Sequence, residues 1–265
     1  MTIHHLNCGT LHPRGSMFGR LGPDLSICHV LLVERAEGLL LVDSGFGTGD
    51  IANPKRLGAP FKAMMRPTLD EAETAVHQVR ARGYQPSDVR DIVVTHLDLD
   101  HAGGLSDFPE ARIHVHATEL AAALQPASKL ERRRYISAQW AHEPRWVEHS
   151  DAGDDWFGFT SVHALDDDIV LIPLAGHTRG HSGVAVRDGE RWLLHAGDSY
   201  FAAGEIASPP RYLPGLVGFQ KLLAVDEAAR RANQARLRQL KTSHPEVSIF
   251  SAHDPVELNA FATAS

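Results

Sequence analysis

The chain has 265 residues and a hydrophobic content of 43%, which is enough for one large α/β domain or two small ones. Its formal charge of −7 argues against nucleic acid or an anionic membrane surface as the main partner. Cys8 and Cys28 are its only cysteines, so a framework of several disulfides is excluded and thiolate ligation of a metal is disfavoured.

No stretch approaches the roughly 18 apolar residues that span a bilayer. The first residues lack the basic-then-apolar layout of a secretory signal. We therefore expect a cytoplasmic protein without a membrane segment. Because the sequence has no internal repeat and no Pro/Gly/Ser-rich linker, we expect a single domain over residues 1–265.

Five apolar runs rich in β-branched residues each end at a single His or Asp. Their length, composition and following turn residues predict buried strands. In chain order they are GLLLVD ending at Asp43, DIVVTH at His96, IVLIPLAGH at His177, WLLHAGD at Asp198 and VSIFSAH at His253.

Two segments between these runs have helical periodicity. Residues 69–82 place Val76 and Val79 on one face, and residues 219–241 place Leu237 and Leu240 at helical spacing. Strands that alternate with helices predict a layered α/β fold. The polar residues at the strand ends predict a site along one edge of the sheet.

The loop DIVVTHLDLDHAGG, residues 91–104, carries His96, Asp98, Asp100 and His101 within six positions. A single such residue after a strand is usually a turn residue or a hydrogen-bonding group. Four together, with no Lys or Arg in the stretch, need a compensating cation if they are buried. A metal ion supplies that charge, and His and Asp ligands without Cys suit Zn²⁺, Mn²⁺ or Fe.

The number of candidate ligands indicates two ions, because it exceeds one tetrahedral shell. The candidates are His96, Asp98, Asp100, His101, His177, His253 and Asp198. Two ions about 3.5–4 Å apart can share a carboxylate and hold a bridging hydroxide, which is a nucleophile near neutral pH. The sequence therefore predicts metal-assisted hydrolysis.

The motifs LLLVDSGFG, THLDLDHAGG, GHTRGH, AGDSY and SAHDP resemble, in order and approximate spacing, the five motifs of the metallo-β-lactamase superfamily. The resemblance covers nearly the whole chain. It implies an αββα sandwich with a dinuclear metal site at the sheet edge. The length and the short gaps are most similar to the acyl-homoserine lactonase and glyoxalase II group.

Motif position implies a role for each candidate. The resemblance implies that His96, Asp98 and His177 hold the first metal, that Asp100, His101 and His253 hold the second, and that Asp198 bridges them. Asp43 matches a residue that orients a ligand.

Asp98 departs from the family pattern H-x-H-x-D-H, which has His at this position. Either Asp98 turns away and leaves its site weak, or it is an oxygen ligand, as an acidic residue is in the superfamily's di-iron flavoproteins. Its spacing between Leu97 and Leu99 favours ligation. Three carboxylates against two divalent ions leave one positive charge instead of two, so we expect a preference for Mn²⁺ or Fe over Zn²⁺.

Tyr200 lies near the position where similar lactonases have a Tyr that assists at the substrate carbonyl. The resemblance makes Tyr200, with Asp100, a candidate catalytic residue; the alternative is a buried structural Tyr. His181 is expected to form structural hydrogen bonds. His114 and His116, on one face of a predicted strand, are expected to lie partly exposed and outside the site.

The segment from about 125 to 162 contains the basic run ERRRY and three of the four Trp. It is predicted to be an insertion with one of two roles. It is either a solvated basic face with a packed aromatic patch, or a lid whose Trp140, Trp146, Trp156 and Phe157 wall an apolar substrate pocket. This patch, or the 219–241 helix, could support a homodimer.

The resemblance implies a hydrolase of a small molecule with a carboxylic ester bond, with a lactone as the first choice. One alternative is a thioester hydrolase of the glyoxalase II type. Asp98 favours another, an iron-dependent redox enzyme such as a persulfide dioxygenase. A non-catalytic binding module is the third class.

Overall fold

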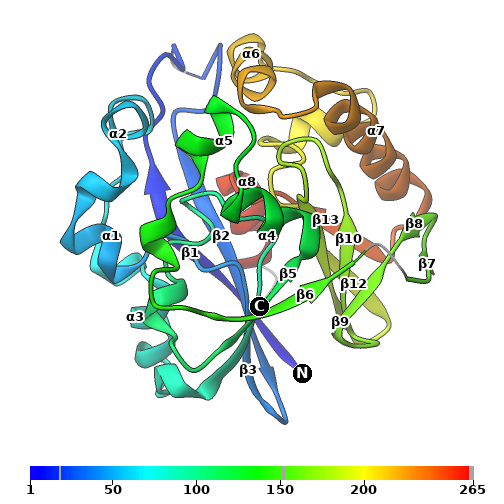
Figure 1. Cartoon of the computed structure of the whole chain (residues 1–265). Coiled ribbons are helices and arrows are strands. Elements are labelled where there is room, and N and C mark those ends of the chain that lie inside the picture. The colour runs from blue at the N-terminus through cyan, green and yellow to red at the C-terminus, as the bar shows by residue number, and fades with distance from the viewer. Residues whose placement is uncertain (18, 151–152, 263–265) are drawn as a thin grey trace.

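Two β-sheets pack face to face between outer layers of helices in the computed structural model, which describes residues 1–17, 19–150 and 153–262 (Figure 1). Between the sheets, Val42 of the first sheet packs in one core with Leu171 and Val184 of the second. A helix covers the outer face of each sheet, through Val76 on the first and Leu237 on the second. The expected αββα sandwich is confirmed.

The first sheet has six strands in sequence order, of which β1 to β3 are antiparallel neighbours and β3 to β6 are parallel. Its strands are β1 (Thr2–Leu11), β2 (Ser26–Arg35), β3 (Gly38–Val42), β4 (Val89–Val93), β5 (Arg112–His116) and β6 (Arg145–His149).

The second sheet has the order β13-β12-β11-β10-β9, in which only the β12–β13 pair is parallel. Its strands are β9 (Val162–Asp166), β10 (Ile169–Pro173), β11 (Ser182–Asp188), β12 (Arg191–His195) and β13 (Val247–Phe250). A small hairpin is formed by β7 (Asp155–Trp156) and β8 (Phe159–Thr160). All five predicted strands are present, as β3, β4, β10, β12 and β13.

These strands are mostly apolar because both faces of each sheet are largely buried. In β3, Leu39 and Leu41 point to the helices on the outer face, whereas Leu40 and Val42 point to the core between the sheets. A continuous apolar run is therefore the correct signal for these strands.

The helices are α1 (Thr48–Ala52), α2 (Ala59–Met65), α3 (Ala75–Ala81), α4 (Ala117–Leu124), α5 (Lys129–Arg134), α6 (Pro214–Leu223), α7 (Glu227–Ser243) and α8 (Pro255–Ala262). Six short 3-10 turns accompany them in the described part of the chain. None of the helices found there is both long and apolar enough to cross a membrane.

The predicted helix over residues 69–82 is shorter in the structure. It begins at α3, where the Thr74 hydroxyl accepts a hydrogen bond from the amide of His77 and so caps the first turn. Val76 and Val79 are buried as predicted. Leu69 has a left-handed φ of +55° and therefore cannot belong to the helix.

The prediction of one helix over residues 219–241 is wrong, because α6 and α7 are separated by residues 224–226. The amides of Val225 and Asp226 leave the helical ladder and donate to the carbonyls of His177 (3.2 Å) and Gly176 (2.9 Å). The Asp226 carboxylate then caps α7 by accepting from the amide of Ala229. Residues 224–226 are therefore hydrogen-bonded to the loop that carries His177.

The segment from 125 to 162 is not one lid. It contains α5, the sixth strand of the first sheet and the β7–β8 hairpin. Trp140 and Trp146 pack in the core of the first sheet, whereas Trp156 and Phe157 pack in the core of the second. The hypothesis that these four side chains form one pocket wall is therefore wrong.

Candidate metal centre

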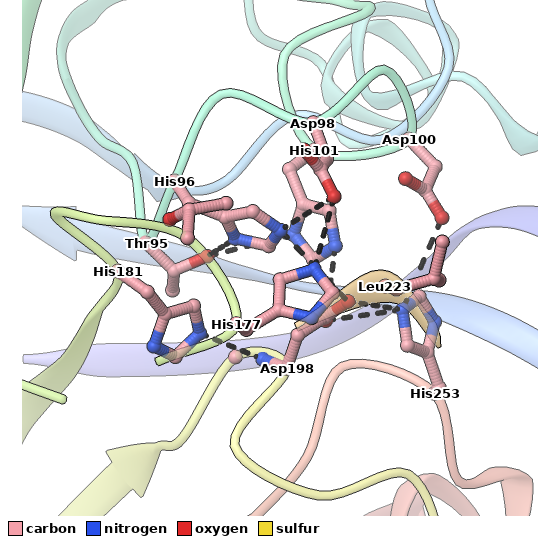
Figure 2. Close-up of polar contacts among 12 residues, drawn as sticks. Thr95, His96, Asp98, Asp100, His101, His177, His181, Asp198, Leu223 and His253 are labelled. Atoms are coloured by element: carbon pink, nitrogen blue, oxygen red, sulfur yellow. Dashed lines mark hydrogen bonds and ion pairs between the residues drawn. The ribbon is translucent and has the colours of Figure 1, made fainter. Parts of the chain in front are cut away.

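The loops that follow β4, β10, β12 and β13 bring their His and Asp side chains to one edge of the sandwich, where they point toward one another (Figure 2). These side chains form two adjoining clusters, in each of which the potential ligand atoms lie within 4.8 Å of one another. The first cluster is His96, Asp98, His177 and Asp198, and the second is Asp100, His101 and His253.

Hydrogen bonds from neighbouring groups orient three of the imidazoles. The Nδ1 atom of His96 lies 2.9 Å from the Thr95 hydroxyl, and that of His253 lies 2.8 Å from the carbonyl of Ile27. The Nδ1 atom of His101 lies 2.8 Å from Asp43. With Nδ1 held in this way, each ring directs Nε2 into the cluster, as metal-binding imidazoles require.

Asp43 holds the backbone of the loop after β4 as well as the imidazole of His101. It has a left-handed φ of +60°, and its carboxylate accepts from the amide (2.7 Å) and the hydroxyl (2.8 Å) of Thr95. Strained backbone of this kind is retained where surrounding contacts enforce it. The expected orienting role of Asp43 agrees with this geometry.

Asp198 lies between the two clusters. Its Oδ2 atom is 3.3 Å from Nε2 of His177, and its Oδ1 atom is 3.2 Å from Nε2 of His101 and 3.1 Å from Nε2 of His253. Oδ2 also lies 3.2 Å from Nε2 of His253, so the carboxylate as a whole reaches imidazoles of both clusters. This is the arrangement that a bridging ligand needs.

The donor set fits two metal ions. Among the described residues, the buried atoms His96 Nε2, His101 Nε2 and Asp198 Oδ1 form no hydrogen bond. Polar atoms are rarely left in this state unless an ion or water satisfies them. Ligands about 2.0–2.2 Å from a tetrahedral ion lie about 3.4 Å apart, which is close to the separations given above.

Burial and the neighbouring charges shift the pKa values of the side chains in the clusters. Burial lowers the pKa of His101, but the carboxylates of Asp198 and Asp43 outweigh it and raise that pKa well above its ordinary value. Burial raises the pKa of Asp198, but His253 and then His101 hold it well below its ordinary value. Burial, followed by the charge of Arg134, lowers the pKa of His177 to about 4. The His177 ring is therefore neutral at pH 7 and free to act as a ligand.

Asp98 faces the cluster, so the alternative in which it turns away is not observed. Its Oδ2 atom lies 3.0 Å from Nε2 of His177 and 3.4 Å from Nε2 of His96. The same oxygen accepts a hydrogen bond from Nη1 of Arg134 at 3.0 Å. Burial alone would raise the pKa of Asp98, but the charges of Arg134 and His96 outweigh it and hold that pKa well below its ordinary value.

Arg134 and Glu119 are two residues of the site that the sequence did not reveal. Arg134 is the last residue of a run of three Arg, and the run resembles a solvated face. Glu131, Arg134 and Tyr135 lie at helical spacing and are buried in the structure, but no pattern in the sequence marks this face as covered. Glu119 is fully buried and accepts hydrogen bonds from the loops of His96 and His177.

His181 has the predicted structural role. Its Nε2 atom accepts from the amide of Asp198 at 2.9 Å, so its Nδ1 atom donates to the carbonyl of Leu174 at 3.1 Å. His181 thus holds the backbone of Asp198.

His114 and His116 lie outside the site as predicted, but both are buried, and His114 Nε2 lies 2.9 Å from Asp91.

The structure does not bring Tyr200 into the cluster. The side chain is fully buried, and its hydroxyl donates to Glu257 at 2.9 Å. Burial and the Glu257 charge raise the pKa of Tyr200 well above its ordinary value, which makes it a poor proton donor. The geometry corrects the catalytic assignment of Tyr200 and favours the structural alternative.

The Tyr200→Phe variant is expected to keep its kcat/KM within about twofold and to lose about 1–2 kcal/mol of unfolding free energy, because one buried hydrogen bond is removed. Steady-state kinetics and thermal unfolding check this expectation, with the exposed Tyr212→Phe as the matched control. If turnover instead fell by about two orders of magnitude at unchanged stability, Tyr200 would return to the catalytic set.

A cavity adjoins the centre between residues 13–16 and 21–26, α2 and α6. Its apolar lining is Leu21, Met64, Met65, Phe201, Leu216 and Phe219, with Arg14 and Ser16 among its polar residues. Phe201 connects it to the centre, because its ring packs edge-on against His253 at 4.8 Å between centroids. An apolar group bound in this cavity would therefore lie beside the two clusters.

Comparisons with known proteins agree with this geometry. The family model described as "Metallo-beta-lactamase superfamily" matches residues 23–253. A protein of Mycobacterium tuberculosis named a "Probable metallo-hydrolase" is 46% identical over 257 residues, covering 96% of this chain and 80% of that protein. N-acyl homoserine lactonase AttM of Agrobacterium fabrum is 27% identical over 226 residues, covering 84% of this chain and 80% of its own length.

The fold also matches a solved lactonase structure. A mutant of Bacillus thuringiensis AiiA, described with N-decanoyl-L-homoserine bound at the active site, superposes with a TM-score of 0.74. The match covers 97% of this chain and 95% of that chain at 20% identity, so it shows a common fold. The family model, the 46% identical relative and the two buried His/Asp clusters lead to one conclusion: the chain belongs to the metallo-beta-lactamase superfamily.

Proposed function

We propose that this protein is a metal-dependent hydrolase that cleaves carboxylic ester bonds, with lactones as its substrate class. The observation that carries the proposal is the position of Asp198, whose two oxygens reach imidazoles of different clusters. A lactonase among the relatives, and the N-decanoyl-L-homoserine bound at the active site of a structure with the same fold, support the substrate class.

Two divalent ions, Zn²⁺, Mn²⁺ or Fe, would be held by the seven residues of the two clusters. Ions bound there would polarise the ester carbonyl and lower the pKa of a water molecule. The chain itself fixes the ligand positions through Thr95, Asp43 and the Ile27 carbonyl.

Asp100 is the proposed proton carrier. Its side chain is 12% exposed and its Oδ2 atom lies 3.9 Å from His253 Nε2, so it borders both the cluster and solvent. A carboxylate in this position can take a proton from water and pass it to the leaving oxygen. Asp100 therefore has a second role beside ligation.

The cavity beside Phe201 is the proposed site for the apolar part of the substrate. Its lining combines methionine, leucine and phenylalanine side chains, which suit a flexible acyl chain. The contact of Phe201 with His253 would place the ester group over the clusters.

Hydrolysis assays on chelator-treated protein test the proposal. We expect turnover of N-acyl homoserine lactones or simple γ-lactones, at least about a 100-fold loss after metal removal, and recovery when Zn²⁺ or Mn²⁺ is returned. Elemental analysis should give about two ions per active chain. Hydrolysis of a glutathione thioester without lactones would favour the thioesterase alternative, and no hydrolysis by protein with two bound ions would refute the proposal.

A further inference from the structure

Arg134 reaches the first cluster from α5 and makes a direct ion pair with Asp98. The two side chains are 4% and 14% exposed, and Nη1 lies 3.0 Å from Oδ2. The other nitrogen, Nη2, donates to the carbonyl of Leu223 at the end of α6. A guanidinium keeps its charge at every relevant pH, so a buried positive charge adjoins the proposed metal site.

The rest of α5 is fixed so that Arg134 has one position. Ser128 caps the helix and receives the reciprocal contact from Glu131. The other oxygen of Glu131 accepts from Nε of Arg179, in the loop between His177 and His181, at 2.6 Å. The hydroxyl of Tyr135, the residue after Arg134, donates to the carboxylate of Glu119 at 3.1 Å. The helix is therefore tied to the loops that carry His96 and His177, two of the three loops of the first cluster.

We infer that Asp98 and Arg134 form one neutral unit in which Arg134 is a positioning residue for the oxygen that faces the metal site. The inference rests on the proposed metal centre. Arg134 holds Oδ2, the same oxygen that lies near His96 and His177. An Asp–Arg pair carries no net charge, and neither does the imidazole found at this position in the family pattern.

The pair changes the charge count of the centre. Asp98, Asp100 and Asp198 alone leave one positive charge when two divalent ions are bound, but the charge of Arg134 restores two. The argument from charge for Mn²⁺ or Fe over Zn²⁺ therefore no longer holds. It also follows that Asp98→His alone does not recreate a histidine site, because it leaves the Arg134 charge buried beside the ions.

A double-substitution cycle tests the unit. Chelator-stripped wild type, Asp98→His, Arg134→Met and the double variant are titrated with Zn²⁺ and with Mn²⁺ by calorimetry. We expect Asp98→His to weaken binding at the first site about 10- to 100-fold. In that background Arg134→Met should strengthen binding at least about tenfold, whereas with Asp98 present it should weaken binding or leave it unchanged.

The exposed Arg133→Met, on the same helix, is the matched control and should leave the affinities unchanged. A double variant that binds no more tightly than Asp98→His would show that the two residues act independently and would overturn the inference.

Thermal unfolding of the stripped proteins provides a readout without metal. Asp98→His should lower Tm, and adding Arg134→Met should restore part of that loss, because no unpaired charge remains buried. If wild type binds neither ion, the proposed metal centre is wrong, and the Tm values alone decide whether the pair is a unit. Equal Tm values for Asp98→His and the double variant would refute it.

Discussion

Asp198→Asn is expected to reduce the metal content from about two ions per chain to one or fewer and to lower kcat/KM for a lactone by at least about 100-fold. The amide keeps the shape of the carboxylate but offers one oxygen, whereas the two oxygens of Asp198 together reach His177, His101 and His253. It also removes the negative charge that faces these imidazoles. Elemental analysis and steady-state kinetics measure the two effects.

The folding of the variant must be checked, because the amide of Asp198 also donates to His181. That bond comes from the backbone and survives the substitution, so near-native thermal unfolding is expected for the stripped proteins. Asp188→Asn, on the exposed end of β11, is the matched control. Two ions and full activity in Asp198→Asn would mean that the centre has no bridging carboxylate at this position.

The strands and the His and Asp residues of the two clusters were predictable because both depend on local sequence. A strand buried on both faces is apolar at every position, and in β3 and β10 this run stops where the chain enters a turn. The His or Asp follows within a few residues, so the apolar run that predicts the strand also predicts where the polar side chain lies. Four of the five residues at the strand ends, His96, His177, Asp198 and His253, lie in the two clusters, and the fifth, Asp43, contacts His101.

The partners of these ligands were not predictable, because they come from distant parts of the chain. Arg134 is 36 residues from Asp98, and the stretch around Asp98 has no basic residue of its own. The break between α6 and α7 likewise depends on the carbonyls of Gly176 and His177, about 50 residues earlier. Helical periodicity continues through the break, so no local pattern marks it.

The aromatic segment shows the same limit. Trp140 and Trp156 lie 16 residues apart in sequence, yet each packs against a different sheet. Composition identified a group of large apolar side chains, but it could not assign them to two separate cores. The residues that do line the cavity beside Phe201 come from α2, α6 and the segment after β1.

Glu119 is the second residue whose substitution should have a large effect, because it joins the loop of His96 to the loop of His177. It is fully buried on α4, and one carboxylate oxygen accepts from the amide of Leu97 (3.0 Å) and the hydroxyl of Tyr135 (3.1 Å). The other accepts from the hydroxyl of Thr178 (2.6 Å) and the amide of Gly180 (3.1 Å). Leu97 follows His96, and Thr178 follows His177.

All four groups on this carboxylate are donors, so Glu119→Gln places an amide NH₂ against donors and leaves at least one of them unpaired. We expect a loss of about 3 kcal/mol in unfolding free energy, or roughly 6–12 °C in Tm, for the chelator-stripped protein. Metal affinity should fall about 10- to 100-fold, because the loops of His96 and His177 are no longer held at a fixed separation.

Calorimetric titration and thermal unfolding test both parts, with the exposed Glu190→Gln as the matched control. Glu119→Ala should be at least as destabilised as Glu119→Gln, since it removes every acceptor and leaves a cavity. A Glu119→Gln protein with wild-type Tm and metal affinity would show that the ligand loops keep their positions without this carboxylate. The separation of His96 and His177 would then depend on the sheets alone.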